Sequence, residues 1–132
     1  MSLRHIKLIR FMLNKKIFTI FFALTVIAIR FGIFLFPNKD LIISGIEIHH
    51  IWIGLIILVL GCFIKNKLKI VAIAIGLGLV ADEFIFMLLC NGQNEEYWSH
   101  YSISGACILA LVILIFANRV MQFFRIPVKN SR

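Results

Sequence analysis

Two histidines and two neighbouring acids are the side chains in this sequence best suited to chemistry. His49 and His50 open one apolar run, and Asp82 and Glu83 stand late in the next apolar run. Imidazole and carboxylate groups bind transition metals, and imidazole also exchanges protons near neutral pH. We interpret Asp82 and Glu83 as candidate catalytic residues, and all four as candidate ligands of a divalent metal such as zinc, iron or manganese. Their spacing forms no local motif such as H-E-x-x-H, so wet histidines at a helix start are an equally good interpretation.

Other polar residues are expected close to these four. Glu47 precedes His50 by three positions and shares its helical face if the helix starts early enough. A second polar segment precedes the last apolar run and contains Glu96, Tyr97, Trp98 and His100. The Tyr-Trp pair is also typical of a membrane-boundary belt, and His100 of a solvated loop. Both interpretations stay open at this point.

The elements that must position these residues are unusually apolar. Hydrophobic residues make up 61% of the 132 residues and charged residues 15%. A soluble domain has about half apolar and about a quarter charged residues. A soluble chain this short leaves much of its surface in water and would expose this excess. The composition therefore predicts a membrane protein.

Four apolar runs are predicted to cross the membrane, because each suits the roughly 20 helical residues that span ~30 Å of hydrocarbon. They cover about residues 17–36, 48–64, 68–90 and 102–124. Residues 1–16 are predicted to form a short basic amphipathic helix on the cytoplasmic surface, and residues 125–132 a cytoplasmic tail. The predicted fold is therefore all-α: a polytopic membrane four-helix bundle over residues 17–124, preceded by that helix.

The basic residues predict the orientation of the bundle. The formal net charge is +8, from 14 Lys and Arg against 6 Asp and Glu. Most of the bases lie before the first run, in the 65–69 turn and after the last run. By the positive-inside rule, both termini are cytoplasmic in a multi-pass protein of the cell inner membrane. The bases then contact anionic membrane lipids, and a nucleic acid partner is not expected.

Three charged residues stand out inside the predicted spans: Arg30 in the first, and Asp82 and Glu83 in the third. Arg30 is six residues before Phe36, and Asp82 is eight before Cys90. At 1.5 Å per residue, both lie roughly 9–12 Å below the outer boundary. A charge at the bilayer centre costs at least ~2.5–3.5 kcal/mol, so it needs a partner. We predict that Arg30 pairs with Asp82 or Glu83, and that the two acids, about 100° apart on their helix, do not share a partner.

The order of these motifs resembles a family of small bacterial and archaeal integral membrane proteins. The resemblance covers about residues 46–105 and rests on His49-His50-x-x-x-Gly54, Gly76-x-Gly78 before Asp82-Glu83, and Glu96-Tyr97-Trp98. The family has no assigned activity, so the resemblance implies a shared set of positions and no reaction. Arg30 has no place in the family pattern. Glycines such as Gly54, Gly76 and Gly105 are expected to let the helices approach closely.

Three functions are consistent with the sequence. The first is a polar site near the outer leaflet, with or without a metal, that acts on a lipid or lipid-linked substrate. The second is a small ion or proton-coupled transporter, which would need a homo-oligomer to form a pore. The third is a non-catalytic membrane assembly protein, in which the buried charges fix helix pairing. The substitutions Asp82→Asn and Glu83→Gln test this third function. A lower yield of folded protein without a separate loss of activity would favour it.

Overall fold

The structure is a computed structural model that describes residues 3–36, 42–43, 46–47, 49–89 and 97–126. This part of the chain is helical, apart from one pair of two-residue strands, which agrees with the predicted all-α class. The elements are α1 (Leu3–Leu35), β1 (Ile42–Ile43), β2 (Ile46–Glu47), α2 (His50–Phe63), α3 (Leu68–Leu89), α4 (His100–Ile115) and α5 (Ala117–Phe123). The strands pair antiparallel, with Ile42 opposite Glu47 and Ile43 opposite Ile46.

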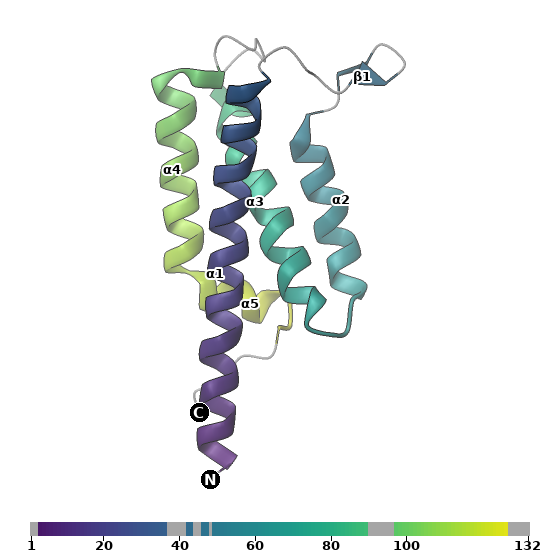
Figure 1. Cartoon of the computed structure of the whole chain (residues 1–132), viewed down its shortest axis with the longest axis vertical. Helices are drawn as coiled ribbons and strands as arrows, with labels where there is room; N and C mark the ends of the chain where they lie inside the picture. The colour runs from purple at the N-terminus through teal and green to yellow at the C-terminus, as the bar shows by residue number, and fades with distance from the viewer. Residues whose placement is uncertain (1–2, 37–41, 44–45, 48, 90–96, 127–132) are drawn as a thin grey trace.

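The first helix is longer than the sequence predicts. We expected a short surface helix over residues 1–16 and a separate span after it, but α1 continues without a break for 33 residues. No glycine or proline stands between residues 3 and 31, so nothing in the sequence ends a helix there. Figure 1 shows the start of α1 projecting beyond the end of the other helices.

Two other boundaries also differ from the prediction. Helix α2 has 14 residues, fewer than the predicted span over 48–64. The predicted fourth span is two helices, α4 and α5, whose axes differ by 73° at Phe116. The bend places Ala117 and Met121 at 0% exposure in the core, so burial of this apolar face accompanies the change of direction.

Two helical segments are long and apolar enough to cross a membrane by length and composition: Phe11–Leu35 and Leu68–Leu88. The bent pair α4 and α5 would make a third if it forms one span. Helix α2 is apolar but shorter than these segments. Two to three such helices are compatible with a membrane protein.

Helix α3 is the centre of the arrangement and packs against α1, α2 and α4 (Figure 1). Glycines permit the closest approach between α2 and α3. A Cβ atom on Gly54 would lie 2.9 Å from the carbonyl oxygen of Gly76, and one on Gly76 would lie 2.9 Å from that of Gly54. This contact brings the start of α2 next to the second half of α3. The candidate site residues of both helices lie in these two segments.

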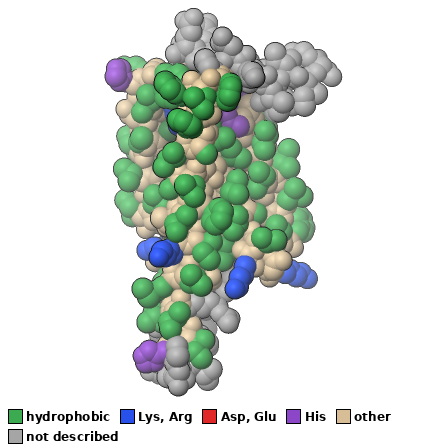
Figure 2. Space-filling model, in the orientation of Figure 1, with side chains coloured by type: hydrophobic (Ala, Val, Ile, Leu, Met, Phe, Trp, Pro, Cys, Tyr) green, Lys and Arg blue, Asp and Glu red, His purple; other side chains and the backbone are tan. Residues whose placement is uncertain are grey.

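The core toward the lower end of Figure 1 is apolar. Phe18 and Phe22 of α1 pack with Ile73 of α3 and Met121 of α5, all at 1% exposure or less. Figure 2 shows that hydrophobic side chains also cover most of the described outer surface in this view, with most of the Lys and Arg side chains at its lower part. The molecule is thus apolar both inside and around its middle.

Candidate functional site

Seven residues from four parts of the chain meet at the upper end of the helices in Figure 1, opposite the α2–α3 turn. We call them the polar network. Helices α1 and α3 contribute from their interiors, α2 and α4 from their first turns, and a short 3₁₀ turn precedes α4. The members are Arg30, His49, His50, Asp82, Glu83, Tyr97 and Ser102.

The predicted pairing of Arg30 with an acid is confirmed. Nε of Arg30 lies 2.6 Å from Oδ1 of Asp82, and the Asp82 side chain is 0% exposed. The two residues come from helices that run in the same direction, at nearly equal distance from their ends. Because each charge would be unstable alone in an apolar surrounding, the pair compensates both.

The rest of the Arg30 guanidinium is also surrounded by partners. Its other nitrogens donate to the carbonyl oxygen of Tyr97 at 3.1 Å, the carbonyl oxygen of Asp82 at 3.3 Å and Oγ of Ser102 at 3.4 Å. Its Cζ lies 4.2 Å from the centre of the Tyr97 ring and 5.8 Å from that of Trp98. These contacts attach α1 to α3 and to the start of α4.

Asp82 accepts hydrogen bonds from three side chains. Besides Arg30, the hydroxyl of Tyr97 donates to its Oδ2, and Nε2 of His50 lies 3.2 Å from the same oxygen. Burial of the phenol, together with the negative charge of Asp82, raises the pKa of Tyr97 well above its usual value. Tyr97 therefore stays neutral and remains a donor to the carboxylate.

Glu83 joins the network to the first turn of α2. Its Oε2 accepts from the backbone N–H of Ile51 at 2.6 Å, and its Oε1 lies 2.7 Å from Nδ1 of His49. The N–H groups of a first helical turn have no partner within the helix, so a carboxylate from α3 satisfies one of them. Glu83 is 2% exposed, whereas the side chain of His49 is 21% exposed.

His50 lies between the two acids, which contradicts our expectation that they would not share a partner. Its Nε2 is 3.2 Å from Oδ2 of Asp82 and its Nδ1 is 3.3 Å from Oε2 of Glu83. Nε2 makes a hydrogen-bonding contact with Asp82, while Nδ1 lies within ion-pair distance of Glu83, whose Oε2 also accepts from Ile51 N–H.

The other candidates are not part of the described network. Trp98 is 41% exposed and touches Arg30 only through its ring, while His100 is an exposed residue at the start of α4. The side chain of Glu47 and the whole of Glu96 lie outside the described residues. Predictions about those two acids stay predictions.

The described side chains do not fit a metal ion as they are placed. No group of three or more His, Cys, Asp and Glu side chains within the described residues is arranged to hold one. The donor atoms of the two histidines face carboxylates in pairs instead of pointing at a common centre. The prediction of zinc, iron or manganese stays a prediction, and no reaction step is derived from a metal.

Sequence reasoning missed two members of the arrangement. Ser102 was grouped with the polar residues at the start of the last span but was not predicted as a site residue, yet its side chain is 0% exposed and contacts Arg30. A small hydroxyl residue in an otherwise apolar helix is a weak signal, which becomes informative only once Arg30 is known to lie beside it. The second is the backbone N–H of Ile51, which no side-chain pattern can indicate.

The fold and the site define an all-helical protein with two to three helices apolar enough to cross a membrane and a buried network of ionisable side chains at one end. No known protein family, curated protein or solved structure matches this chain. The resemblance to a family of small membrane proteins therefore stays a prediction.

Proposed function

We propose that this chain is a polytopic integral membrane protein whose polar network is an acid–base site acting on a lipid or lipid-linked substrate. In this proposal, the helices form a four-helix bundle in the cell inner membrane. The polar network lies near the outer leaflet, and both termini lie on the cytoplasmic side.

The exposed apolar surface supports the bilayer. Large side chains on the outside of every long helix are more than half exposed, among them Ile27, Ile56, Leu88 and Ile108. Ile27, Ile56 and Ile108 lie between the level of the polar network and that of the lysines of the α2–α3 turn, and Leu88 lies beyond the network near the end of α3. A soluble protein rarely exposes a contiguous apolar area of this extent. In a bilayer, this surface contacts lipid tails, and the lysines stay on the cytoplasmic side.

The observation that carries the chemistry is the contact of His49 with Glu83. A buried carboxylate 2.7 Å from Nδ1 holds the ring in one orientation and stabilises it when it carries a proton. Within the described residues, Nε2 of His49 has no hydrogen-bond partner, and the ring is partly exposed. His49 is therefore placed to take a proton from a substrate hydroxyl or a water molecule and return it to the leaving group.

This proposal gives the acids a different role from the one expected from the sequence. Glu83 orients His49 and compensates its positive charge, while Asp82 holds Arg30, Tyr97 and His50 in place. Both acids are almost fully buried, so they are positioning residues and His49 is the catalytic residue.

The surroundings of His49 support an apolar substrate. Trp52 and Phe84, close in sequence to His49 and Glu83, are 54% and 42% exposed. In this proposal, the substrate approaches His49 through the apolar surroundings to which these side chains are exposed. This favours a substrate that is itself in the membrane over a soluble one.

A second candidate function is a non-catalytic assembly protein. Every buried side-chain nitrogen and oxygen of the described residues has a hydrogen-bond partner, as expected of a network that only fixes helix pairing. A transport pathway through a single chain has no comparable support, because Phe18, Phe22 and Ile73 fill the described core below the network with apolar groups.

The test uses purified protein in vesicles of phosphatidylethanolamine and phosphatidylglycerol, with lipid products followed by mass spectrometry. We expect wild type to change a lipid species and His49→Gln to lower that rate at least 10²-fold. His5→Gln is the matched control, because His5 is an exposed residue in the first turn of α1, and it should retain the wild-type rate.

Two results would count against the proposal. Absence of any lipid product with wild-type protein, or equal rates for wild type and His49→Gln, would leave the assembly protein as the better interpretation. Release of the protein from cell membranes by alkaline carbonate would contradict the integral membrane assignment separately.

A further inference from the structure

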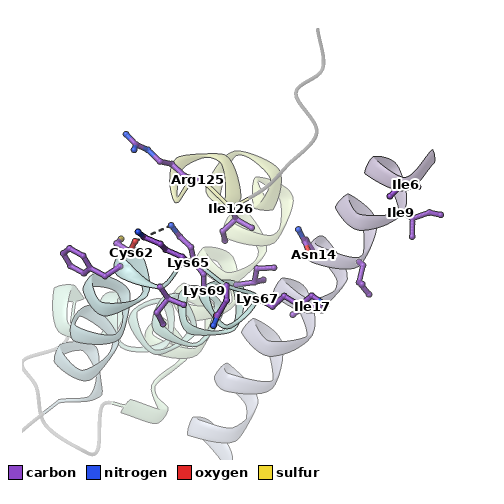
Figure 3. A pocket seen from close by; sticks show the side chains of 15 residues that line it. Ile6, Ile9, Asn14, Ile17, Cys62, Lys65, Lys67, Lys69, Arg125 and Ile126 are labelled. Atoms are coloured by element: carbon purple, nitrogen blue, oxygen red, sulfur yellow. Dashed lines mark hydrogen bonds between the residues drawn. The ribbon is translucent and has the colours of Figure 1, made fainter. Parts of the chain in front are cut away.

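A groove whose charged lining residues are all positive lies at the end of the helices opposite the polar network. It is bounded by the first half of α1, the α2–α3 turn and the residues that follow α5, and it has a volume of about 960 Å³ (Figure 3). We call it the basic groove. Its volume is within the range of small-molecule sites, roughly 300–1,000 Å³.

The walls of the basic groove differ in chemistry. Isoleucines line it from α1 and from both other segments, including Ile9, Ile17 and Ile126. The α2–α3 turn and the end of α5 add the cationic residues Lys65, Lys67, Lys69 and Arg125. The two described acids with described side chains, Asp82 and Glu83, belong to the polar network at the opposite end. The groove therefore combines an apolar wall with uncompensated positive charge.

The backbone around Arg125 fixes the end of α5 beside the groove, and the Arg125 side chain extends outward from its rim (Figure 3). Helix α5 ends in a Schellman motif: Ile126 N–H donates to the carbonyl oxygen of Met121 at 2.8 Å, and Arg125 N–H donates to that of Gln122 at 2.9 Å. This motif needs a left-handed residue, usually glycine, and here Arg125 has a φ of 53°. The turn buries Ile126 at 2% exposure and leaves Arg125 exposed.

We propose that the basic groove binds one anionic phospholipid. The phosphate group would lie beside the lysines of the α2–α3 turn, with Arg125 adding positive charge at the rim, and an acyl chain would lie along the isoleucines of α1. A soluble anion would use the cations but leave the apolar wall in contact with water, whereas an amphiphile with a negative head satisfies both. The inference rests on the membrane part of the proposed function and is independent of any chemistry at His49.

The charge complementarity predicts a measurable preference. Each lysine or arginine near an anionic headgroup contributes about a fivefold gain in binding. Protein in detergent micelles is titrated with phosphatidylglycerol or phosphatidylcholine, and bound lipid is counted by native mass spectrometry. We expect wild type to retain phosphatidylglycerol at least about tenfold better than phosphatidylcholine.

The groove variant combines Lys65→Gln, Lys67→Gln and Arg125→Gly. Glycine at 125 fits the left-handed backbone better than arginine, so the variant keeps the end of α5 folded. The matched control removes the same charge from exposed residues outside the groove, by Lys15→Gln, Lys16→Gln and Arg119→Gln. We expect the groove variant to lose about 10²-fold in phosphatidylglycerol binding and the control to stay within about twofold.

The outcomes separate the alternatives. Equal losses in both variants, or no preference for phosphatidylglycerol in wild type, would overturn the groove as a lipid site. Displacement of the lipid by inorganic phosphate at a similar concentration would also overturn it, in favour of a site for soluble anions. His49→Gln should bind phosphatidylglycerol as wild type does, so a failure of the acid–base proposal and a failure of the lipid site give different results.

Discussion

The polar network and the basic groove lie at opposite ends of the same helices and treat ionised side chains in opposite ways. In the polar network, Arg30 and the histidines meet two carboxylates at 2.6–3.3 Å, and both acids are almost fully buried. In the basic groove, the cations of the α2–α3 turn have no described carboxylate among the lining residues. In the polar network, the charged side chains are paired within the protein. In the basic groove, the positive side chains have no described carboxylate beside them and could pair with an anionic ligand.

This difference implies different consequences of losing a charge. Removal of one partner from a buried pair leaves the other without compensation, so stability falls. Removal of a cation from a region of like charges relieves repulsion and leaves stability nearly unchanged. Four predictions test this comparison through the free energy of unfolding in detergent micelles.

The largest effect is expected for Asp82→Asn. The substitution leaves the guanidinium of Arg30 without a counter-charge and also weakens the contacts of His50 and Tyr97, so it should cost about 3–5 kcal/mol. Thermal unfolding followed by circular dichroism measures this loss. A double variant, Arg30→Met with Asp82→Met, removes both charges and should regain part of the stability. If the double variant is no more stable than Asp82→Asn, the pair does not act as a compensated unit.

The sequence predicted much of this pair but not its surroundings. Equal depth on two apolar helices was sufficient to match Arg30 with the Asp82-Glu83 pair but not to choose between the two acids, because position along a helix can be counted from its end. The direction of a side chain around the helix cannot be counted in the same way. The sharing of His50 by both acids and the contact of Ser102 therefore became visible only in the structure.

Helix boundaries show the same limit. The apolar content of all the long helices was predictable, but the bend at Phe116 follows no proline or glycine and coincides with burial of Met121. Packing between distant segments decides such a bend, and hydropathy along one segment does not record it. The continuity of α1 was predictable in principle, because residues 3–31 contain no helix breaker.

The second prediction concerns Tyr97→Phe. It removes the hydroxyl that donates to Asp82 and leaves the ring in place, and a hydrogen bond to a charged group contributes about 1.5–3 kcal/mol. Tyr101→Phe is the matched control, because Tyr101 is 76% exposed and close in sequence. Chemical unfolding of both variants compares them directly. Equal, small losses in the two variants would mean that the Tyr97 hydroxyl adds nothing to the network.

The third prediction tests how helix packing positions the network. Gly54→Ala places a Cβ 2.9 Å from the carbonyl oxygen of Gly76, so α2 must shift away from α3. We expect a loss of about 1–3 kcal/mol, as for other overpacked contacts. Gly32→Ala is the control, since among the described residues no atom beyond its own stretch of helix lies within 4 Å of the added Cβ, and it should be neutral or slightly stabilising. A stable Gly54→Ala variant would show that α2 does not need this close approach.

The smallest effect is expected at the other end of the molecule. Lys67→Gln should change the free energy of unfolding by no more than about 0.5 kcal/mol, because Lys67 is exposed and has Lys65 and Lys69 close in sequence. Salt screens repulsion between exposed like charges over about 10 Å at 0.1 M, but it affects buried pairs less. Unfolding of wild type and Lys67→Gln at low and high salt, without added lipid, measures both effects. The free energy of unfolding should rise slightly more between low and high salt for wild type than for Lys67→Gln. A large loss of stability in Lys67→Gln at either salt concentration would mean that this lysine is matched within the protein, and the two ends would then not differ as the comparison requires.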